Sequence, residues 1–204
     1  MEAVINALNQ RSISNSVARV YYGAPRTSSN SVVRAKSGMR VRADIESAMV
    51  VHADTVMRVC SVYLREPADR EDAFQETFLR YARYERSFNG DEHRKAWLIR
   101  VASNVCKDQL KSSAARTESL DALTEDGLTV TGDDGQEGQR VLEHSEVLDA
   151  LRGIDQRYGI VLYLKYFEGY TAAQIAKLLD MPENTVYTNL SRGKQRLKGV
   201  LGHE

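Results

Sequence analysis

Apolar residues recur at helical spacing through two long stretches of the chain, 44–111 and 142–201. In the first stretch, the pattern predicts a helix from Asp44 to about Arg65, and Pro67 then interrupts it. A second helix is predicted to end at about Tyr84. Its expected N-cap is Asp69, with Asp72 at the capping-box position.

Residues 87–93 contain Asn, Gly and Asp and are predicted to form a loop. A third helix follows, because Trp97, Val101 and Val105 stand four residues apart and so share one face. This helix is predicted to end at about Lys111. Trp97 is expected to pack in the core, because it belongs to the same apolar stripe as the two valines.

Residues 112–141 break the helical pattern with Gly, Ser, Thr and Asp, and they are predicted to form a flexible acidic linker. Helices are expected to resume at about 142–153 and 155–167. Gly159, inside the second of these, should cost about 1 kcal/mol relative to Ala. The linker predicts two domains without a fixed mutual orientation.

The final segment has the pattern of a helix-turn-helix. Thr171 and Gln174 form a T-x-x-Q capping box that opens a short helix, and a tight turn is expected at 180–181. Pro182 then stands at the first position of a longer helix that runs to Leu201. The positions of the longer helix predicted to face inward are Val186, Leu190, Leu197 and Leu201.

No useful β-alternation is present, so the predicted fold class is all-α, with two small helical domains. The predicted divisions are a disordered basic extension at 1–43, a first helical domain at 44–111, the linker at 112–141 and a second helical domain at 142–204. Met39 is a candidate for the true translation start, in which case residues 1–38 would not be translated.

Charge is segregated although the formal net charge is zero. Residues 1–43 carry seven basic residues and one acid, whereas 112–140 carry seven acids and two basic residues. This pattern suggests segments with separate partners. No stretch approaches the roughly 18 apolar residues of a membrane span. The two cysteines, Cys60 and Cys106, are read as small buried hydrophobes in a reduced, cytoplasmic protein.

Sequence motifs for catalysis are lacking. The chain has no GxxxxGK[ST] and no HExxH, and none of its four histidines has a metal-ligand neighbour at i+4. We therefore expect no enzyme activity, no catalytic residue, no metal site and no cofactor.

The last helix has the features of a DNA-reading helix. Short polar side chains near its N-terminus can reach base edges, whereas Arg192, Lys194, Arg196 and Lys198 suit phosphates better. An ordinary amphipathic helix with a solvated basic face explains the charge. It does not explain the capping box, the turn and the proline together.

The segment "DAFQETF" places Asp72, Gln75 and Glu76 on one helix face, opposite its apolar residues. An acidic face is unexpected in a chain whose other end is built to bind DNA. A merely solvated face is the alternative to a protein-binding one.

Three longer segments carry a resemblance that accounts for this face. They are "EPADREDAFQETFLRYARYERSF", "KAWLIRVASNVCKDQL" and "GIDQRYGIVLYLKYFEGYTAAQIAKLLDMPENTVYTNLSRGKQRLKGVL". The first two resemble region 2, and the third resembles region 4, of the extracytoplasmic-function (group IV) sigma factors of bacterial RNA polymerase. The matches cover about 45–110 and 147–201 in the expected order. The resemblance implies a sigma factor that binds core polymerase and promoter DNA.

The resemblance also implies functional residues. The core-binding face, which docks on the clamp helices of the polymerase largest subunit, would comprise Asp72, Gln75 and Glu76. Recognition and melting of the −10 element would involve Phe88, Asn89, Arg100, Asn104 and Lys107. Reading of the −35 duplex would involve Asn184, Thr185, Tyr187, Thr188, Ser191, Arg192 and Arg196. An anti-sigma factor is a further candidate partner, because such factors are common in the family.

Two alternatives stay open at this point. A plain helix-turn-helix regulator with an unrelated N-terminal domain explains 171–198 equally well, but not the "DAFQETF" helix. The acidic linker either mimics nucleic acid near the polymerase active site, as in the family, or is simply a soluble spacer.

Residues 1–38 precede the first helical period, so we predict that they are dispensable for core binding and promoter recognition. A chain that begins at Met39 should start transcription as the full chain does, measured by run-off transcription with core polymerase. Loss of transcription would reveal a role for the extension in binding or regulation.

Overall fold

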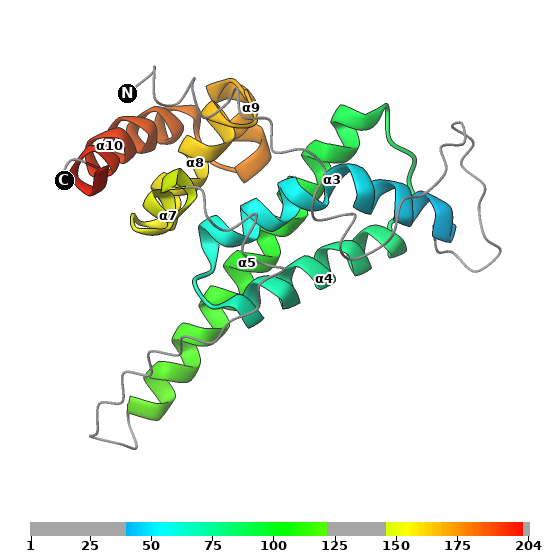
Figure 1. Cartoon of the computed structure of the whole chain (residues 1–204), viewed down its shortest axis with the longest axis horizontal. Coiled ribbons are helices and arrows are strands. Elements are labelled where there is room, and N and C mark those ends of the chain that lie inside the picture. The colour runs from blue at the N-terminus through cyan, green and yellow to red at the C-terminus, as the bar shows by residue number, and fades with distance from the viewer. Residues whose placement is uncertain (1–39, 122–145, 202–204) are drawn as a thin grey trace.

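The computed structural model describes residues 40–121 and 146–201, and the regular elements within these residues are helices. Figure 1 shows two groups of helices side by side. We call α3, α4 and α5 the first unit, and α7 to α10 the second unit. The predicted all-α class is confirmed. Residues 1–39 and 122–145, which include most of the predicted extension and linker, lie outside the described residues.

The first unit consists of α3 (Arg42–Tyr63), α4 (Pro67–Arg83) and α5 (Asp91–Asp121). α4 begins before the expected N-cap at Asp69, so the capping box predicted there is wrong. The reason is Pro67, whose fixed φ suits the first helical turn and whose missing N–H needs no partner there. The residue that precedes the helix, Glu66, makes no side-chain cap hydrogen bond.

α5 continues past the predicted end at Lys111, through residues 112–121 of the stretch predicted as linker. No Gly or Pro interrupts the sequence before Gly127, and the segment contains the good helix formers Ala, Arg, Glu and Leu. Nothing local therefore ends the helix at Lys111. The last turns of α5 project beyond the other helices in Figure 1.

The second unit consists of α7 (Glu146–Arg152), α8 (Gln156–Tyr166), α9 (Ala172–Leu179) and α10 (Glu183–Leu201). The Asp155 carboxylate caps α8 by accepting the backbone N–H of Arg157 at 3.0 Å. The predicted capping box of Thr171 and Gln174 is present at the start of α9. Asp180 ends α9 in the left-handed conformation, with φ of 54°. The predicted helix-turn-helix is therefore confirmed.

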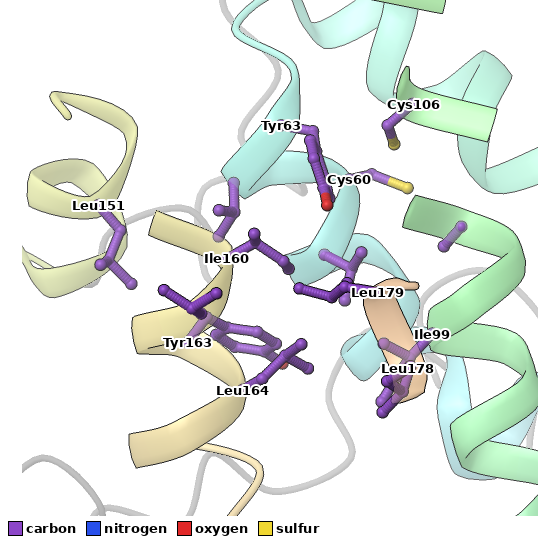
Figure 2. Close-up of a cluster of buried hydrophobic side chains, with 14 of the residues drawn as sticks. Cys60, Tyr63, Ile99, Cys106, Leu151, Ile160, Tyr163, Leu164, Leu178 and Leu179 are labelled. Carbon is purple, nitrogen blue, oxygen red and sulfur yellow. The ribbon is translucent and has the colours of Figure 1, made fainter. Parts of the chain in front are cut away.

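α8 has no solvent-facing side over its central turns, because residues 158–164 are all buried. The other helices of the second unit cover part of its surface, and α3 of the first unit packs against the remainder. Figure 2 shows Ile160 of α8 pointing toward Cys60 and Tyr63 of α3. The hydrophobic core is thus continuous across both units.

This shared core contradicts the expectation that the two domains have no fixed mutual orientation. A helix that is apolar all round must be covered all round. The nearly uninterrupted apolar run "YGIVLYL" at 158–164 indicates a helix that is buried on all sides. The expectation of independent domains rested on the polar composition of the linker and did not take this run into account. A polar contact crosses the same boundary, where Arg152 Nε donates to the Ser61 carbonyl oxygen at 3.3 Å.

Gly159 stands at a close approach of α8 to α7 and α3. A Cβ at this position would lie 2.9 Å from the Leu151 carbonyl oxygen of α7 and 3.1 Å from Val62 Cγ1 of α3. A backbone carbonyl cannot turn away as the end of a flexible side chain can. The glycine that weakens the isolated helix therefore permits its packing.

We predict that Gly159→Ala lowers the free energy of unfolding by about 1–3 kcal/mol, the usual cost of overpacking a core. Thermal or urea unfolding measures the effect. The matched control is Gly199→Ala in α10, where an added Cβ meets nothing within 4 Å. That change should raise stability by about 0.5–1 kcal/mol through helix propensity. Stabilisation by both changes would contradict the close packing of α3, α7 and α8.

Candidate protein and nucleic-acid interfaces

The acidic face of α4 lies on the outside of the first unit. Asp72 and Gln75 are exposed and Glu76 is half-buried, whereas Ala73 and Phe78 on the opposite side are buried. Glu76 Oε1 also pairs with Arg80 Nε at 2.7 Å. The structure thus presents the three predicted residues together on one accessible helix face. A basic partner would compete with Arg80 for Glu76.

Phe88 is packed into an aromatic cluster at the loop between α4 and α5. Its ring stacks on Tyr84 and Tyr81, with centroids 5.2 and 5.8 Å away, and meets Trp97 edge-on at 5.6 Å. Trp97 is partly buried and packs against the hydrophobic core. Asn89 beside it is exposed, and its backbone N–H donates to His93 Nδ1 at 3.1 Å. Of the two predicted loop residues, Asn89 is the accessible one.

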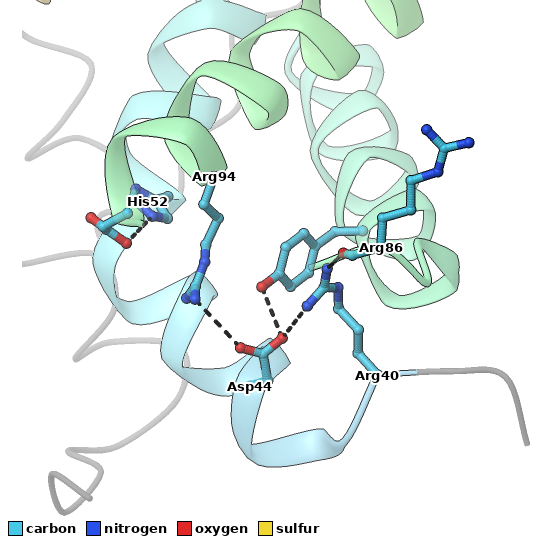
Figure 3. A network of polar contacts seen from close by, with 7 residues as sticks. Arg40, Asp44, His52, Arg86 and Arg94 are labelled. Atoms are coloured by element: carbon cyan, nitrogen blue, oxygen red, sulfur yellow. Dashed lines mark hydrogen bonds and ion pairs between the residues drawn. The ribbon is translucent and has the colours of Figure 1, made fainter. Parts of the chain in front are cut away.

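A buried ionic network joins the start of α3 to this loop (Figure 3). Arg40 Nη1 pairs with Asp44 Oδ2 at 2.8 Å, and the Tyr81 hydroxyl donates to the same oxygen at 3.0 Å. Arg94 Nη2 lies 3.6 Å from the other carboxylate oxygen. Burial and the Asp44 charge raise the pKa of Tyr81, so its hydroxyl stays a proton donor.

A second contact fixes the start of α5. The ring of His52, which is buried in α3, is hydrogen-bonded through Nε2 to Asp91 Oδ1 at 3.0 Å. Burial lowers the pKa of His52, although Asp91 opposes the shift, which favours a neutral ring that donates its Nε2–H to the carboxylate. The loop between α4 and α5 is therefore held at both ends.

The polar face of α5 borders the second unit, where Lys107 is half-buried and Arg100 remains exposed. Arg100 Nη2 donates to the Lys177 carbonyl oxygen at 3.2 Å, and Lys107 Nζ donates to the Leu179 carbonyl oxygen at 3.4 Å. Both acceptors belong to the last turn of α9, where unpaired carbonyls and the helix dipole favour cations. Burial lowers the pKa of Lys107. Asn104, the third predicted residue of this face, is exposed.

An ion pair also joins the first unit to the second unit. Lys95 Nζ of α5 lies 2.6 Å from Glu168 Oε2, in the turn between α8 and α9, and the Glu168 side chain is only 6% exposed. The Tyr163 hydroxyl donates to the other carboxylate oxygen of Glu168. A buried carboxylate needs such partners, because an uncompensated charge in a core is strongly destabilising.

The outer face of α10 is free. All the positions predicted to face DNA are exposed: Asn184, Thr185, Tyr187, Thr188, Ser191, Arg192 and Arg196. The opposite face packs on α8 and α9 through Val186, Leu190 and Leu197, three of the four residues predicted to point inward. Leu201 ends the helix, and its side chain lies outside the description. Tyr187 is 56% exposed, and its hydroxyl donates to Glu183 Oε1 at 3.2 Å on the same face.

Sequence reasoning missed Arg40 and the contacts between the units. Arg40 fell within a Ser- and Arg-rich stretch read as disordered, and Lys95 and Glu168 are far apart in sequence without a motif. Within residues 40–121 and 146–201, no group of three His, Cys, Asp or Glu side chains is arranged to hold a metal ion. Over the same residues, no helix is long and apolar enough to cross a membrane.

Comparison with known proteins assigns each of the two units to a protein family. Residues 49–116 match the family Sigma-70 region 2, and residues 144–197 match Sigma-70, region 4. The chain is 30% identical over 152 residues to ECF RNA polymerase sigma factor SigL of Mycobacterium tuberculosis, covering 74% of this chain and 84% of that protein. It is 27% identical over 141 residues to ECF RNA polymerase sigma-E factor of Haemophilus influenzae, covering 65% and 75%.

Solved structures share the fold. The sigma factor RpoE of Bartonella quintana, in complex with the anti-sigma factor NepR, superposes with a TM-score of 0.60 at 15% identity, covering 79% of this chain and 98% of that chain. CnrH, in complex with the cytosolic domain of CnrY, gives 0.53 at 19% identity, covering 80% and 91%.

The order of the two matched regions and the likeness over most of the chain identify the class: the chain belongs to the extracytoplasmic-function (ECF) sigma factors of RNA polymerase. As a sigma factor, it acts in transcription initiation by binding core RNA polymerase and promoter DNA, and it is not an enzyme. The rival reading as a plain helix-turn-helix regulator is thereby excluded, because the first unit matches region 2.

We predict that Arg192→Ala weakens binding to a duplex −35 element by about 1–3 kcal/mol if its guanidinium contacts a base edge in bidentate fashion. Fluorescence anisotropy with a labelled duplex measures the loss. Lys198→Ala, which removes the same charge further along α10, is the control. It should cause a smaller loss that is independent of sequence. An unchanged affinity for Arg192→Ala would mean that another face of α10 enters the groove.

Proposed function

We propose that this sigma factor divides its work among three surfaces. The α4 face of Asp72, Gln75 and Glu76 docks on core polymerase. The loop at Phe88 and Asn89, with the polar face of α5, captures the melted −10 element. The exposed face of α10 reads the −35 duplex. The observation that carries the proposal is the separation of an accessible acidic face on α4 from an accessible polar and basic face on α10.

The same proposal assigns roles to the chain segments. Residues 44–111 would carry core binding and −10 recognition, residues 142–204 would carry −35 recognition, and residues 112–141 would join them. Since its partner is the transcription machinery, we propose that the protein works in the cytoplasm.

Engagement of −10 DNA would change the polar contacts between α5 and α9. Arg100, which is exposed, and Lys107, which is half-buried, each donate one hydrogen bond to a backbone carbonyl of α9 and keep further N–H donors. These side chains would contact phosphates with the remaining donors, or exchange the carbonyl oxygens for phosphates. Full separation of α9 from α5 would in addition expose Leu178 and Leu179, which belong to the shared core.

An anti-sigma factor is a candidate third partner. One solved structure that shares the fold described above is a complex of the sigma factor RpoE with the anti-sigma factor NepR, and another is a complex of CnrH with the cytosolic domain of CnrY. A protein that binds across the first and second units would favour this arrangement, in which Arg100 and Lys107 are occupied.

The proposed function is tested by run-off transcription with core polymerase, using the promoter upstream of the protein's own gene and then other genomic fragments. A defined transcript that requires the added protein is expected. Absence of any promoter-specific transcript from core polymerase that has bound the protein would contradict the proposal.

We predict that Asp72→Arg combined with Glu76→Arg abolishes recovery of core polymerase in a pull-down. Like charges across an interface cost several kcal/mol, which reduces assembly by orders of magnitude. The fold should persist, because the substitution at the exposed Asp72 is expected to change stability by about 0.5 kcal/mol or less, and the lost pair between Glu76 and Arg80 is a surface i,i+4 pair worth about 0.5 kcal/mol. Circular dichroism and −35 duplex binding by the same sample check this.

The control for this prediction is Glu66→Arg combined with Asp108→Arg. It changes the charge equally at two exposed residues outside the α4 face and should leave core binding intact. Normal recovery of core polymerase by the folded Asp72 and Glu76 variant would refute the docking role of this face.

A further inference from the structure

Arg40 is enclosed by the first unit, although it lies in a part of the sequence that carries no helical pattern. Its backbone N–H donates to the Ala82 carbonyl oxygen at 2.9 Å, which pairs the start of the described chain with the end of α4. Its side chain is 6% exposed. By contrast, the side chain of Arg42 is 91% exposed and pairs only with Glu46 on the surface.

The Arg40 guanidinium touches the loop between α4 and α5 at two points. Nη2 donates to the Arg86 carbonyl oxygen at 2.5 Å, and the guanidinium carbon lies 4.7 Å from the centre of the Phe88 ring. The hydrogen bond holds the loop backbone at Arg86, and the ring contact holds the side chain of Phe88, which precedes Asn89. The path of residues 86–88 is therefore tied to Arg40.

Only an arginine can make this set of contacts. Its planar fork directs Nη1 to Asp44 and Nη2 to Arg86 while its flat face covers the Phe88 ring. A lysine ammonium is a single point charge without a flat face. It would keep the ion pair with Asp44 and lose either the carbonyl contact or the stacking.

The network fixes the position of the loop relative to α4 and α5. Tyr81 of α4 and Arg94 of α5 both hold the Asp44 carboxylate, which in turn holds Arg40 (Figure 3). Arg40 then sets the place of the loop relative to both helices. A loop that captures an unstacked base needs such a fixed position, since misplacement by about 1 Å is enough to lose a productive geometry.

We propose that Arg40 is a positioning residue for −10 recognition: by holding the packed Phe88, it places the exposed Asn89 where this residue selects the unstacked bases of the non-template strand. The inference rests on the proposed role of this loop in −10 capture. Arg40 itself is covered and does not touch DNA, so its effect passes through the loop.

The test uses holoenzyme assembled from core polymerase and the full chain, on a promoter first mapped with the wild-type protein. Run-off transcription is measured from this promoter and from copies in which each −10 base is substituted in turn. The readout is the ratio of transcript from the original promoter to transcript from each substituted one. A lower fraction of folded protein lowers both yields equally and leaves this ratio unchanged.

Arg40→Ala should reduce the ratio at the base read by the loop by roughly tenfold, the scale of one base contact in single-strand binding. Arg40→Lys should give an intermediate ratio, and it serves as the test variant if Arg40→Ala does not fold. Arg42→Ala, two positions away and exposed, should keep the wild-type ratio. A chain that begins at Met39 retains Arg40 and should also keep it.

A spectroscopic measurement adds an independent check. Trp97 is the single tryptophan of the chain, and its ring centroid lies 5.6 Å from that of Phe88. The fluorescence emission of Trp97 in the free protein therefore reports on the loop. Arg40→Ala should shift this emission and Arg42→Ala should not.

Two results would overturn the inference. One is an equal loss of transcript from original and substituted promoters with Arg40→Ala, which would mean that Arg40 only stabilises the fold. The other is an unchanged ratio in a folded variant. If the wild-type holoenzyme itself does not discriminate among −10 bases, the proposed role of the loop fails instead, so the two failures are distinguishable.

Discussion

The structure depends on the burial of α8. Seven consecutive residues, 158–164, are buried, and no single neighbouring helix can cover a cylinder on all sides. The helices of the second unit cover part of it, and α3 supplies the rest. Gly159 allows the close approach, because the Leu151 carbonyl and Val62 leave no room for a side chain. From this one constraint follows a single core shared by region 2 and region 4.

The shared core decides which functional surfaces are accessible. The α4 face and the outer face of α10 both point away from the boundary between the units and remain free. The α5 face lies at the boundary, so two of its cations find their partners at the end of α9. Accessibility here is a property of how the units pack, since each surface would be open on its own unit.

The carboxylates that are shielded from solvent each have cationic and hydroxyl partners, because an unpaired buried charge is strongly destabilising. Asp44 is surrounded by Arg40, Arg94 and the Tyr81 hydroxyl, and Glu168 at the boundary has Lys95 and Tyr163. These contacts are directional, unlike the apolar packing around them. They therefore define the position of the loop and of the second unit more narrowly than hydrophobic burial alone could.

The sequence by itself determined the helical class, the helix-turn-helix and the exposed faces of α4 and α10, because these depend on local spacing. The capping box at Thr171, the turn at 180–181 and the inward positions Val186, Leu190 and Leu197 all depend on the spacing of residues within one helix or at the junction of two consecutive ones. The sequence also carried the family resemblance, since its motifs are contiguous. Such features are readable because i, i+3 and i+4 neighbours are fixed by the helix itself.

Only the tertiary structure decided the start of α4, the extension of α5, the packing of the two units and the role of Arg40. The start of α4 turned on a competition between Pro67 and Asp69 that local rules leave open. Arg40 meets Arg86 across a sequence separation of 46, and Arg100 meets Lys177 across 77. No periodicity links residues so far apart. Their contacts exist because burying α8 and enclosing Asp44 bring distant segments together, and that outcome depends on the whole core.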